Sequence, residues 1–385
     1  TIDFVTLLDA VVSDGVFPSA DEAKIYLTGL AETVPSISNV KAYAQIVQEK
    51  YLVRQLMGVA KDILQDAGDE PDADLLLENA EQRIYEIRSG RDSSALTPLS
   101  SSMVETLTNL QKISGPDADK YKGIPTGFRL LDTVLTGLGR GDLVILAARP
   151  GMGKTSFALN IATRVAMQQK VPVAIFSLEM TKEQLTNRIL SAEAGIDSQR
   201  LRVGEMHDED WTHLWDACDT MSRAKIYIDD TAGITAMDMR SRARRLKAEH
   251  GLDLIVVDYL QLMQGSGKRN YSGDRQQEVS EISRSLKALA RELDVPVLAL
   301  SQLSRSVESR QVKRPMLSDL RESGSLEQDA DIVAFLYRED YYNPETENKH
   351  TELIIAKHRN GPVDTVNLFF QKQFTKFVGF TKRES

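Results

Sequence analysis

The sequence contains a single cysteine among its 385 residues, Cys218, which excludes an internal disulfide bond. Its five histidines do not stand at metal-ligand spacings such as H-E-x-x-H, and no second cysteine can complete a site. We therefore expect no structural zinc, and we expect Cys218 to be a small buried apolar residue. The scarcity of cysteine also agrees with a reducing compartment.

Long apolar runs are absent too, because none approaches the ~20 residues that a membrane-spanning helix needs. Residues 1–5 contain neither an initiator methionine nor the basic and then apolar pattern of a signal peptide. We expect no membrane role, a cytoplasmic location and a trimmed N-terminus. A hydrophobic content of 42% with 27% charged residues is typical of globular proteins, and the length fits two unequal domains.

Positive charge is not in excess, since the formal net charge is −9. The imbalance lies in residues 1–90, which carry 16 acidic and 7 basic side chains, whereas residues 91–385 carry 40 of each. No overall positive field would attract a phosphate backbone. Any contact with nucleic acid must therefore use local basic loops.

The first part of the chain has helical periodicity. Apolar residues recur at helical spacing in 40–64 and in 73–87, which predicts two amphipathic helices joined by a turn at 68–72. The pattern is typical of a small helical module used for packing or oligomerisation. We assign residues 1–90 to a helical N-terminal domain.

A linker is predicted next, because residues 89–102 are polar and rich in serine. A short amphipathic helix follows, with apolar residues at every third or fourth position: Met103, Leu107, Leu110 and Ile113. This helix needs a partner surface, which another subunit can supply. We assign residues 91–122 to the linker region.

From residue 123 onward, apolar strands alternate with amphipathic helices, a pattern typical of a largely parallel sheet with helices on its faces. Residues 123–385 are thus expected to form an α/β domain. The predicted strands are 143–147, 173–177, 226–229, 254–258, 297–301, 332–337, 353–356 and 366–370. The predicted helices are 154–167, 182–194, 236–249 and 275–293, the second of which begins at a capping box, 181–184.

A phosphate-binding loop, residues 148–155, follows the first strand and opens the first helix. Its glycines permit close backbone approach, and the helix N-terminus supplies partial positive charge. Lys154 can reach the β- and γ-phosphates of ATP, and Thr155 can ligate Mg²⁺. The strict pattern has Gly where this loop has Ala148. The expected nucleotide-binding residues here are Arg149, Pro150, Gly151, Met152, Gly153, Lys154, Thr155 and Ser156.

Polar residues at the ends of other strands complete this site. Asp258 ends an apolar strand in the Walker B arrangement, in which the carboxylate holds Mg²⁺. Glu179, just past the second strand, is expected to orient the attacking water as a base. Gln302, which follows the fifth strand, can sense the γ-phosphate through a hydrogen bond. A helix-start carboxylate and a plain loop glutamine are the structural alternatives for these two residues.

Two polar loops, 264–274 and 304–322, follow the fourth and fifth strands and carry basic residues, including Arg269 and Arg321. Loops beside an ATP site can couple hydrolysis to a phosphate backbone, although solvated surface loops are the ordinary alternative. Late in the chain, Lys357 and Arg359 alternate along a strand and therefore point to one face. Such cations can act on a neighbouring subunit's γ-phosphate as an arginine finger.

Several blocks together resemble the bacterial DnaB-type replicative helicases: 124–128, 148–155, 177–180, 257–262, 300–305, 319–325, 327–331 and 357–361. The resemblance covers nearly the whole chain. It implies a RecA-like P-loop NTPase domain in 123–385, preceded by a linker helix and a partial helical collar domain. It also implies a homo-hexamer that moves 5′ to 3′ on single-stranded DNA and unwinds the duplex.

The resemblance assigns further roles. Arg188 is added on the nucleotide side, and Lys357 and Arg359 become fingers that act in trans. The residues expected to bind DNA are Arg321, Glu322, Gly324 and Arg269. The helix at 103–113 is expected to dock on the adjacent motor domain. Helicase loader and primase are the partners implied for a full-length protein.

Two other functions fit parts of the pattern. A RecA-like strand-exchange recombinase would form filaments without processive unwinding, but the linker helix and the pair at 357 and 359 favour the helicase. A non-motor ATPase switch would control protein partners through its nucleotide state. ATP turnover that DNA stimulates would distinguish the motor from such a switch.

Overall fold

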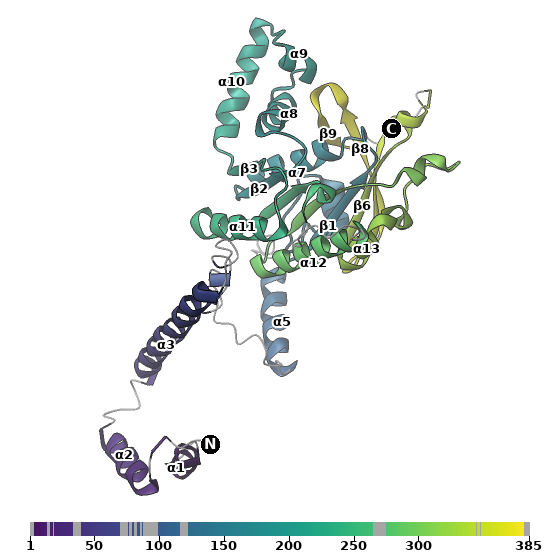
Figure 1. Cartoon of the computed structure of the whole chain (residues 1–385). Helices are drawn as coiled ribbons and strands as arrows, with labels where there is room; N and C mark the ends of the chain where they lie inside the picture. The colour runs from purple at the N-terminus through teal and green to yellow at the C-terminus, as the bar shows by residue number, and fades with distance from the viewer. Residues whose placement is uncertain are drawn as a thin grey trace. The chain divides into compact units, whose positions relative to one another are not determined.

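The computed structural model describes residues 4–13, 16–17, 19–33, 40–69, 76, 79–80, 83–84, 87, 99–115, 122–264, 275–343, 345–346 and 348–380. It divides into two compact units, Thr1–Met103 and Val104–Ser385, which are described separately below (Figure 1). No helix among the described residues is long and apolar enough to cross a membrane.

The first unit is helical, with α1 (Phe4–Ser13), α2 (Ala20–Thr33) and α3 (Val40–Asp69). Helix α3 continues past the predicted end at residue 64 and includes Gly68, so the turn predicted at 68–72 is wrong at its start. Most of the second predicted helix, 73–87, lies outside the described residues. The apolar stripe of α3 is exposed in this chain, at Ile46, Tyr51, Leu52 and Leu56.

Helix α5 (Leu99–Ser114) begins four residues before the predicted start at Met103. The predicted linker therefore ends too late, because its three serines form the first turn of this helix. Met103, Leu107 and Leu110 are exposed, as expected for an amphipathic helix whose partner surface is elsewhere. The side chain of Ile113 lies outside the described set.

The second unit is built on a nine-stranded sheet in the order β3-β2-β4-β5-β1-β6-β7-β8-β9. The first six strands in this order are parallel, and β7, β8 and β9 extend the sheet in antiparallel fashion. The strand bounds are β1 Leu143–Ala148, β2 Val173–Ser177, β3 Ile226–Asp229, β4 Leu254–Asp258, β5 Val297–Gln302, β6 Ile332–Arg338, β7 Thr351–His358, β8 Asp364–Gln371 and β9 Lys376–Gly379. The largely parallel sheet and all eight predicted strands are confirmed.

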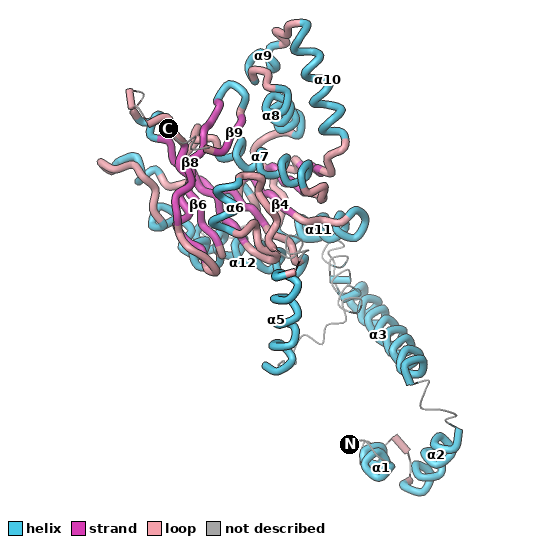
Figure 2. Tube along the Cα trace, turned by 180° about the vertical axis from the view of Figure 1, so that it is seen from behind, coloured by secondary structure: helices cyan, strands magenta, loops and turns pink. Residues whose placement is uncertain are grey.

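Helices lie on both sides of the sheet (Figure 2). Alternate residues of β1 enter two different cores: Val144 and Leu146 pack with Phe157 of α7 (Lys154–Gln168), and Ile145 packs with Leu286 of α12 (Arg275–Leu293). Both faces of the central strands are buried, which explains their continuous apolar runs. The two cores hold β1 rigidly, and the phosphate loop follows directly from its end.

Other helices of the second unit are α6 Arg129–Leu135, α8 Lys182–Ala194, α9 Ser198–Val203, α10 Asp208–Ser222, α11 Ala236–His250, α13 Gly324–Asp329 and α14 Glu339–Tyr342. The capping box at the start of α8 is confirmed, since the side chains of Thr181 and Gln184 each bind the other's backbone N–H. Helices α6, α9, α10, α13 and α14 and strand β9 were not predicted. Cys218, on α10, is half-buried, so the expectation of a fully buried thiol is wrong.

Strand β9 anchors the antiparallel extension to α7 through Phe377, which has no exposed surface. We expect Phe377→Ala to lower the free energy of unfolding by about 3–5 kcal/mol, because it removes a fully buried aromatic ring. Phe369→Ala, on neighbouring β8, is the matched control, since that ring is 42% exposed. Urea denaturation of both variants measures the difference. Equal losses would contradict the packing described.

Candidate active site

The phosphate loop needs glycine at two positions. Gly151 has a φ of 80° and Gly153 a φ of 97°, both in the left-handed region that other residues rarely adopt. A Cβ atom at Gly151 would lie 2.9 Å from the Tyr341 ring, and one at Gly153 would lie 2.9 Å from the Phe377 ring. The loop is therefore held between two aromatic side chains, with its backbone free to approach a phosphate.

The predicted Walker residues meet at the carboxyl end of the parallel strands. Thr155 donates from Oγ1 to Asp258 Oδ2 at 2.8 Å, and Lys154 Nζ lies 4.0 Å from Asp258 Oδ1. Lys154 also lies over the ring of Tyr259, 4.6 Å from its centroid. Burial lowers the pKa of Lys154, and the negative charges of Asp258 and Glu179 oppose that shift.

Asp258 fits a magnesium ligand. Its side chain is only 2% exposed, and its Oδ1 atom is buried with no hydrogen-bond partner. A buried carboxylate oxygen without a partner is costly, and a divalent cation removes that cost. Thr155 and Asp258 together provide the oxygen ligands that Mg²⁺ prefers.

A cavity of about 500 Å³ opens beside these residues. Its walls include ten of the residues predicted for the nucleotide and its hydrolysis: Arg149, Pro150, Gly151, Gly153, Lys154, Thr155, Ser156, Glu179, Arg188 and Gln302. Arg188, on α8, is partly buried, which lowers its pKa, while the charges of Asp258 and Glu179 raise it. The cavity is thus lined by the cations Arg149, Lys154 and Arg188, the carboxylate of Glu179 and the amide of Gln302.

Two predicted residues have other contacts. Met152 is buried in the core formed with α7 and does not line the cavity. The guanidinium of Arg149 pairs with Glu308 at 2.8 Å and donates to the Leu303 carbonyl at 2.7 Å, so its charge is directed at the segment after β5. Both residues remain part of the loop through their backbone, and their role in nucleotide binding stays a prediction.

Sequence reasoning missed several residues of the cavity. Gln184, Phe370 and Thr375 line it, the last two from β8 and the turn after it. Gln261 fixes the backbone of Gln302, the last residue of β5. Its Nε2 donates to the Gln302 carbonyl at 3.3 Å, and its Oε1 accepts from the Gln302 N–H at 3.4 Å. Nothing in the sequence of the antiparallel strands indicates that they lie beside the phosphate loop.

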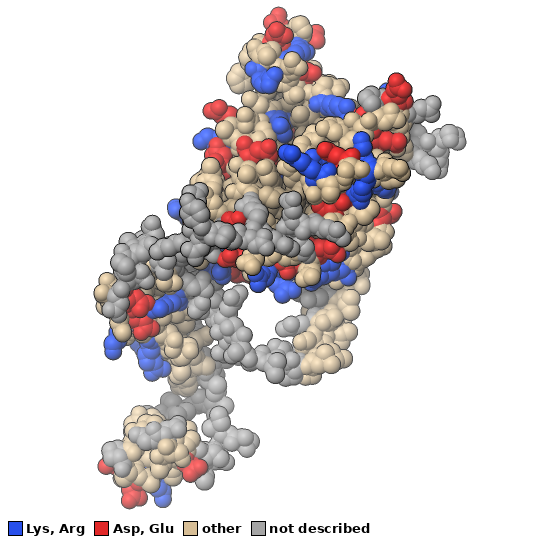
Figure 3. Space-filling view, turned by 45° about the vertical axis from the view of Figure 1, so that its right-hand side comes forward, with Lys and Arg blue, Asp and Glu red and all other residues tan. Residues whose placement is uncertain are grey.

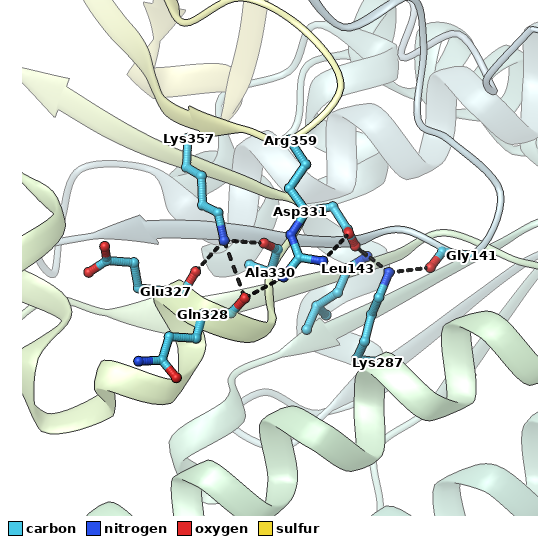
Figure 4. A network of polar contacts seen from close by, with 9 residues as sticks. All are labelled: Gly141, Leu143, Lys287, Glu327, Gln328, Ala330, Asp331, Lys357 and Arg359. Carbon is cyan, nitrogen blue, oxygen red and sulfur yellow. Dashed lines mark hydrogen bonds and ion pairs between the residues drawn. The ribbon is translucent and has the colours of Figure 1, made fainter.

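The late pair of cations lies at the opposite edge of the sheet (Figure 4). His358 pairs with Ile332 at the start of β6, so Lys357 and Arg359 lie near the start of β1, while the phosphate loop follows its end. Both side chains contact the carbonyl of Gln328, which places them on one face, as their alternation predicts. They do not line the nucleotide cavity of their own chain.

Lys357 is engaged within its own chain. Its Nζ atom donates to the carbonyls of Glu327, Gln328 and Ala330, at 2.5, 3.3 and 2.7 Å, around the C-terminus of α13. These contacts use all three ammonium donors. Burial lowers the pKa of Lys357, and the charge of Arg359 lowers it further. To bind a phosphate, this lysine must first leave the helix end.

The residues predicted to bind DNA are described only in part. Arg269 lies in the undescribed stretch 265–274, and the side chains of Arg321 and Glu322 are also outside the description. Their backbone ends a 3-10 helix (Leu317–Ser323) and begins α13.

The stretch 304–322 is more ordered than the polar loop we expected. It contains a second 3-10 helix, Arg305–Ser309, and two of its arginines form ion pairs, Arg310 with Asp319 and Arg314 with Glu352. On the face in Figure 3, acidic and basic side chains are interspersed over the second unit, in line with its balanced charge.

Comparison with known proteins decides the family. The model of the family described as "DnaB-like helicase C terminal domain" matches residues 123–379. The chain belongs to the DnaB family. It is 55% identical over 360 residues to the replicative DNA helicase DnaB of Geobacillus stearothermophilus, covering 93% of this chain and 79% of that protein. It is 51% identical to the replicative DNA helicase DnaC of Bacillus subtilis (strain 168), covering 99% and 84%.

Solved structures agree with this assignment. One of them, an isolated ATPase domain, is 42% identical with a TM-score of 0.70, covering 74% of this chain and 100% of that one. A DnaB-like replicative helicase, solved in a study of its interactions with primase, is 40% identical with a TM-score of 0.72, covering 92% and 83%. The DnaB-family chain is thus an ATP-dependent replicative DNA helicase with a RecA-like motor domain, and the recombinase alternative is not supported.

The contact that a side chain at position 153 would make with Phe377 can be tested separately from backbone strain. We expect Gly153→Ala to cost roughly 1–2 kcal/mol for the left-handed backbone and about 1–3 kcal/mol more for the clash with Phe377. Gly195→Ala is the control, because Gly195 has a φ of 68° and open space around its Cβ position. Thermal unfolding and fluorescent-nucleotide binding should show that only Gly153→Ala loses nucleotide affinity. Equal behaviour would contradict the geometry.

Proposed function

We propose that this helicase hydrolyses Mg²⁺-bound ATP between neighbouring copies of itself in a hexamer, and uses the energy to move 5′ to 3′ on single-stranded DNA. The observation that carries the proposal is the buried, partnerless oxygen of Asp258 beside Lys154 and Thr155. This arrangement suits a cation and a polyphosphate. Held by Thr155 and Asp258, Mg²⁺ would neutralise charge on the phosphate oxygens.

The remaining cavity residues take separate roles. Lys154 and the backbone of the phosphate loop hold the β- and γ-phosphates, and Arg188 adds charge from α8. Glu179 is exposed to the cavity, where it can orient the attacking water. Gln302 ends β5 at the same edge and senses the γ-phosphate, with its backbone fixed by Gln261.

Arg359 acts on a neighbour's site because it cannot reach its own. The six residues of β1 separate the two edges of the sheet by roughly 20 Å. The Arg359 side chain is 43% exposed, so it can enter the cavity of an adjacent copy. Lys357 joins it by exchanging the α13 carbonyls for phosphate oxygens. The fingers and the phosphate loop of one site therefore come from two subunits.

The other partners follow from the family. One relative of known structure is a DnaB-like helicase that was described together with its interactions with primase. This similarity supports primase as a partner of the full-length protein, and a helicase loader is expected as well. We assign the DNA phosphates to Arg321, Glu322, Gly324 and Arg269. The exposed apolar face of α5, at Met103, Leu107 and Leu110, docks on the adjacent motor domain.

Glu179→Gln tests the assignment of the base. We expect kcat for ATP to fall about 10²- to 10⁴-fold, because the amide cannot accept a proton from water, while nucleotide affinity stays nearly unchanged. Glu183→Gln, in the first turn of α8 and outside the cavity, is the control and should keep full activity. A Glu179→Gln variant with near-normal kcat would show that another group is the base.

Subunit mixing tests the shared site. Lys154→Ala and Arg359→Ala should each abolish DNA-stimulated ATP turnover and unwinding of a forked duplex. In an equal mixture, roughly a quarter of the sites combine an intact loop with an intact finger, so ATP turnover should partly return. Arg245→Ala, on the exposed face of α11, should leave both activities unchanged. Normal activity of Arg359→Ala alone would refute the shared site.

A further inference from the structure

A buried carboxylate stands directly behind Arg359 (Figure 4). Asp331, which precedes β6, is 5% exposed. Its Oδ2 atom accepts a hydrogen bond from the backbone N–H of Leu143 at 2.8 Å and another from Lys287 Nζ. Its Oδ1 atom lies 3.7 Å from the Arg359 guanidinium. Asp331 therefore contacts both Lys287 and Arg359.

The main chain of Asp331 makes the same connections. Its N–H donates to the Leu143 carbonyl at 2.9 Å, and its carbonyl accepts from the N–H of Arg359, also at 2.9 Å. The residue thus joins the start of β1, the start of β6 and the end of β7. Asp331 thus contacts both the backbone and the side chain of Arg359.

Asp331 faces two cations, Lys287 and Arg359, and the carboxylate of Asp142 also interacts with both of them. Lys287 is held more firmly because it also donates to the Gly141 carbonyl at 2.8 Å. The Arg359 guanidinium is fixed on one side by the Gln328 carbonyl at 2.6 Å and attracted on the other by Asp331. Its contact with the carboxylate is long and its side chain is 43% exposed, so its charge is oriented without being neutralised.

A residue needed only to close the sheet would not require a negative charge here, because an uncharged acceptor could bind the N–H of Leu143 and the backbone hydrogen bonds already join the three strands. Burying the charge has a desolvation cost, which Lys287 offsets. Arg310, by contrast, is paired with Asp319 at 2.5 Å and has little freedom. The longer contact of Arg359 with Asp331, 3.7 Å, leaves its guanidinium free to reach toward a neighbouring subunit while its orientation is kept.

We propose that Asp331 is a positioning residue for hydrolysis in the neighbouring subunit, because it aims the Arg359 guanidinium at that subunit's phosphates. The inference rests on the proposed shared site. Asp331 touches neither the nucleotide nor the reacting atoms, and it acts only through Arg359. Its loss should therefore lower kcat for ATP and leave KM nearly unchanged, since the phosphate loop that binds the nucleotide belongs to the other chain.

The test uses Asp331→Asn, which keeps the hydrogen-bond acceptor for Leu143 and removes the charge. Alone, this variant should turn over ATP roughly tenfold more slowly. Mixed with Lys154→Ala subunits it should regain activity, because its intact phosphate loop then meets a neighbour with a correctly aimed Arg359. A defect inside the Asp331→Asn subunit's own nucleotide site would not be rescued in this way, and absence of rescue would overturn the proposal.

Two further variants separate the explanations. Mixed equally with Lys154→Ala subunits, the double variant Arg359→Ala with Asp331→Asn should regain as much ATP turnover as Arg359→Ala regains, because Asp331 acts only through Arg359; a smaller recovery would also overturn the inference. If Asp331→Asn fails to fold, Asp331→Asn with Lys287→Met removes both buried charges and undergoes the same mixing test. Failure of Arg359→Ala to be rescued by Lys154→Ala would instead reject the shared site itself.

Discussion

The buried carboxylate of Asp258 is the charge around which the nucleotide site is arranged. One of its oxygens is bound by Thr155, and the other has no hydrogen bond. Lys154, at 4.0 Å, offsets part of the cost of burying this charge, at the expense of its own solvation. A cation that binds here gains an already desolvated ligand. Oδ1 of Asp258 is therefore costly to bury alone, and the same atom favours the binding of a cation.

The two ends of the parallel strands carry different chemistry, and the proposed shared site follows from this difference. The carboxyl ends of the strands supply the phosphate loop, Glu179 and Gln302, as expected for ligand sites in open α/β sheets. The amino ends carry Asp331 and, through antiparallel β7, Arg359. A rigid sheet keeps these groups apart within one chain. The proposed site therefore draws on two copies of the chain.

The sequence predicted the parallel strands almost residue for residue, because strands buried on both faces are continuous apolar runs that end at polar residues such as Asp258. Because parallel strands end at the same side of the sheet, the sequence also predicted which polar side chains would meet there. Helix α10 escaped prediction because only Ala217 is buried on it, so it has no apolar stripe. The partners of Lys357 could not be foreseen, since they are backbone carbonyls that no residue pattern reveals. Nor does spacing show that Phe370 arrives beside the loop.

The ion pair between Arg149 and Glu308 has a mechanical consequence. Arg149 belongs to the phosphate loop, and Glu308 belongs to the 3-10 helix that follows β5. The chain runs on from there to Arg321 and Glu322. A loop that shifts as its ligand changes must either drag that helix with it or break a contact at an arginine that is only 8% exposed. The pair thus couples any movement of the phosphate loop to the segment for which DNA binding is proposed.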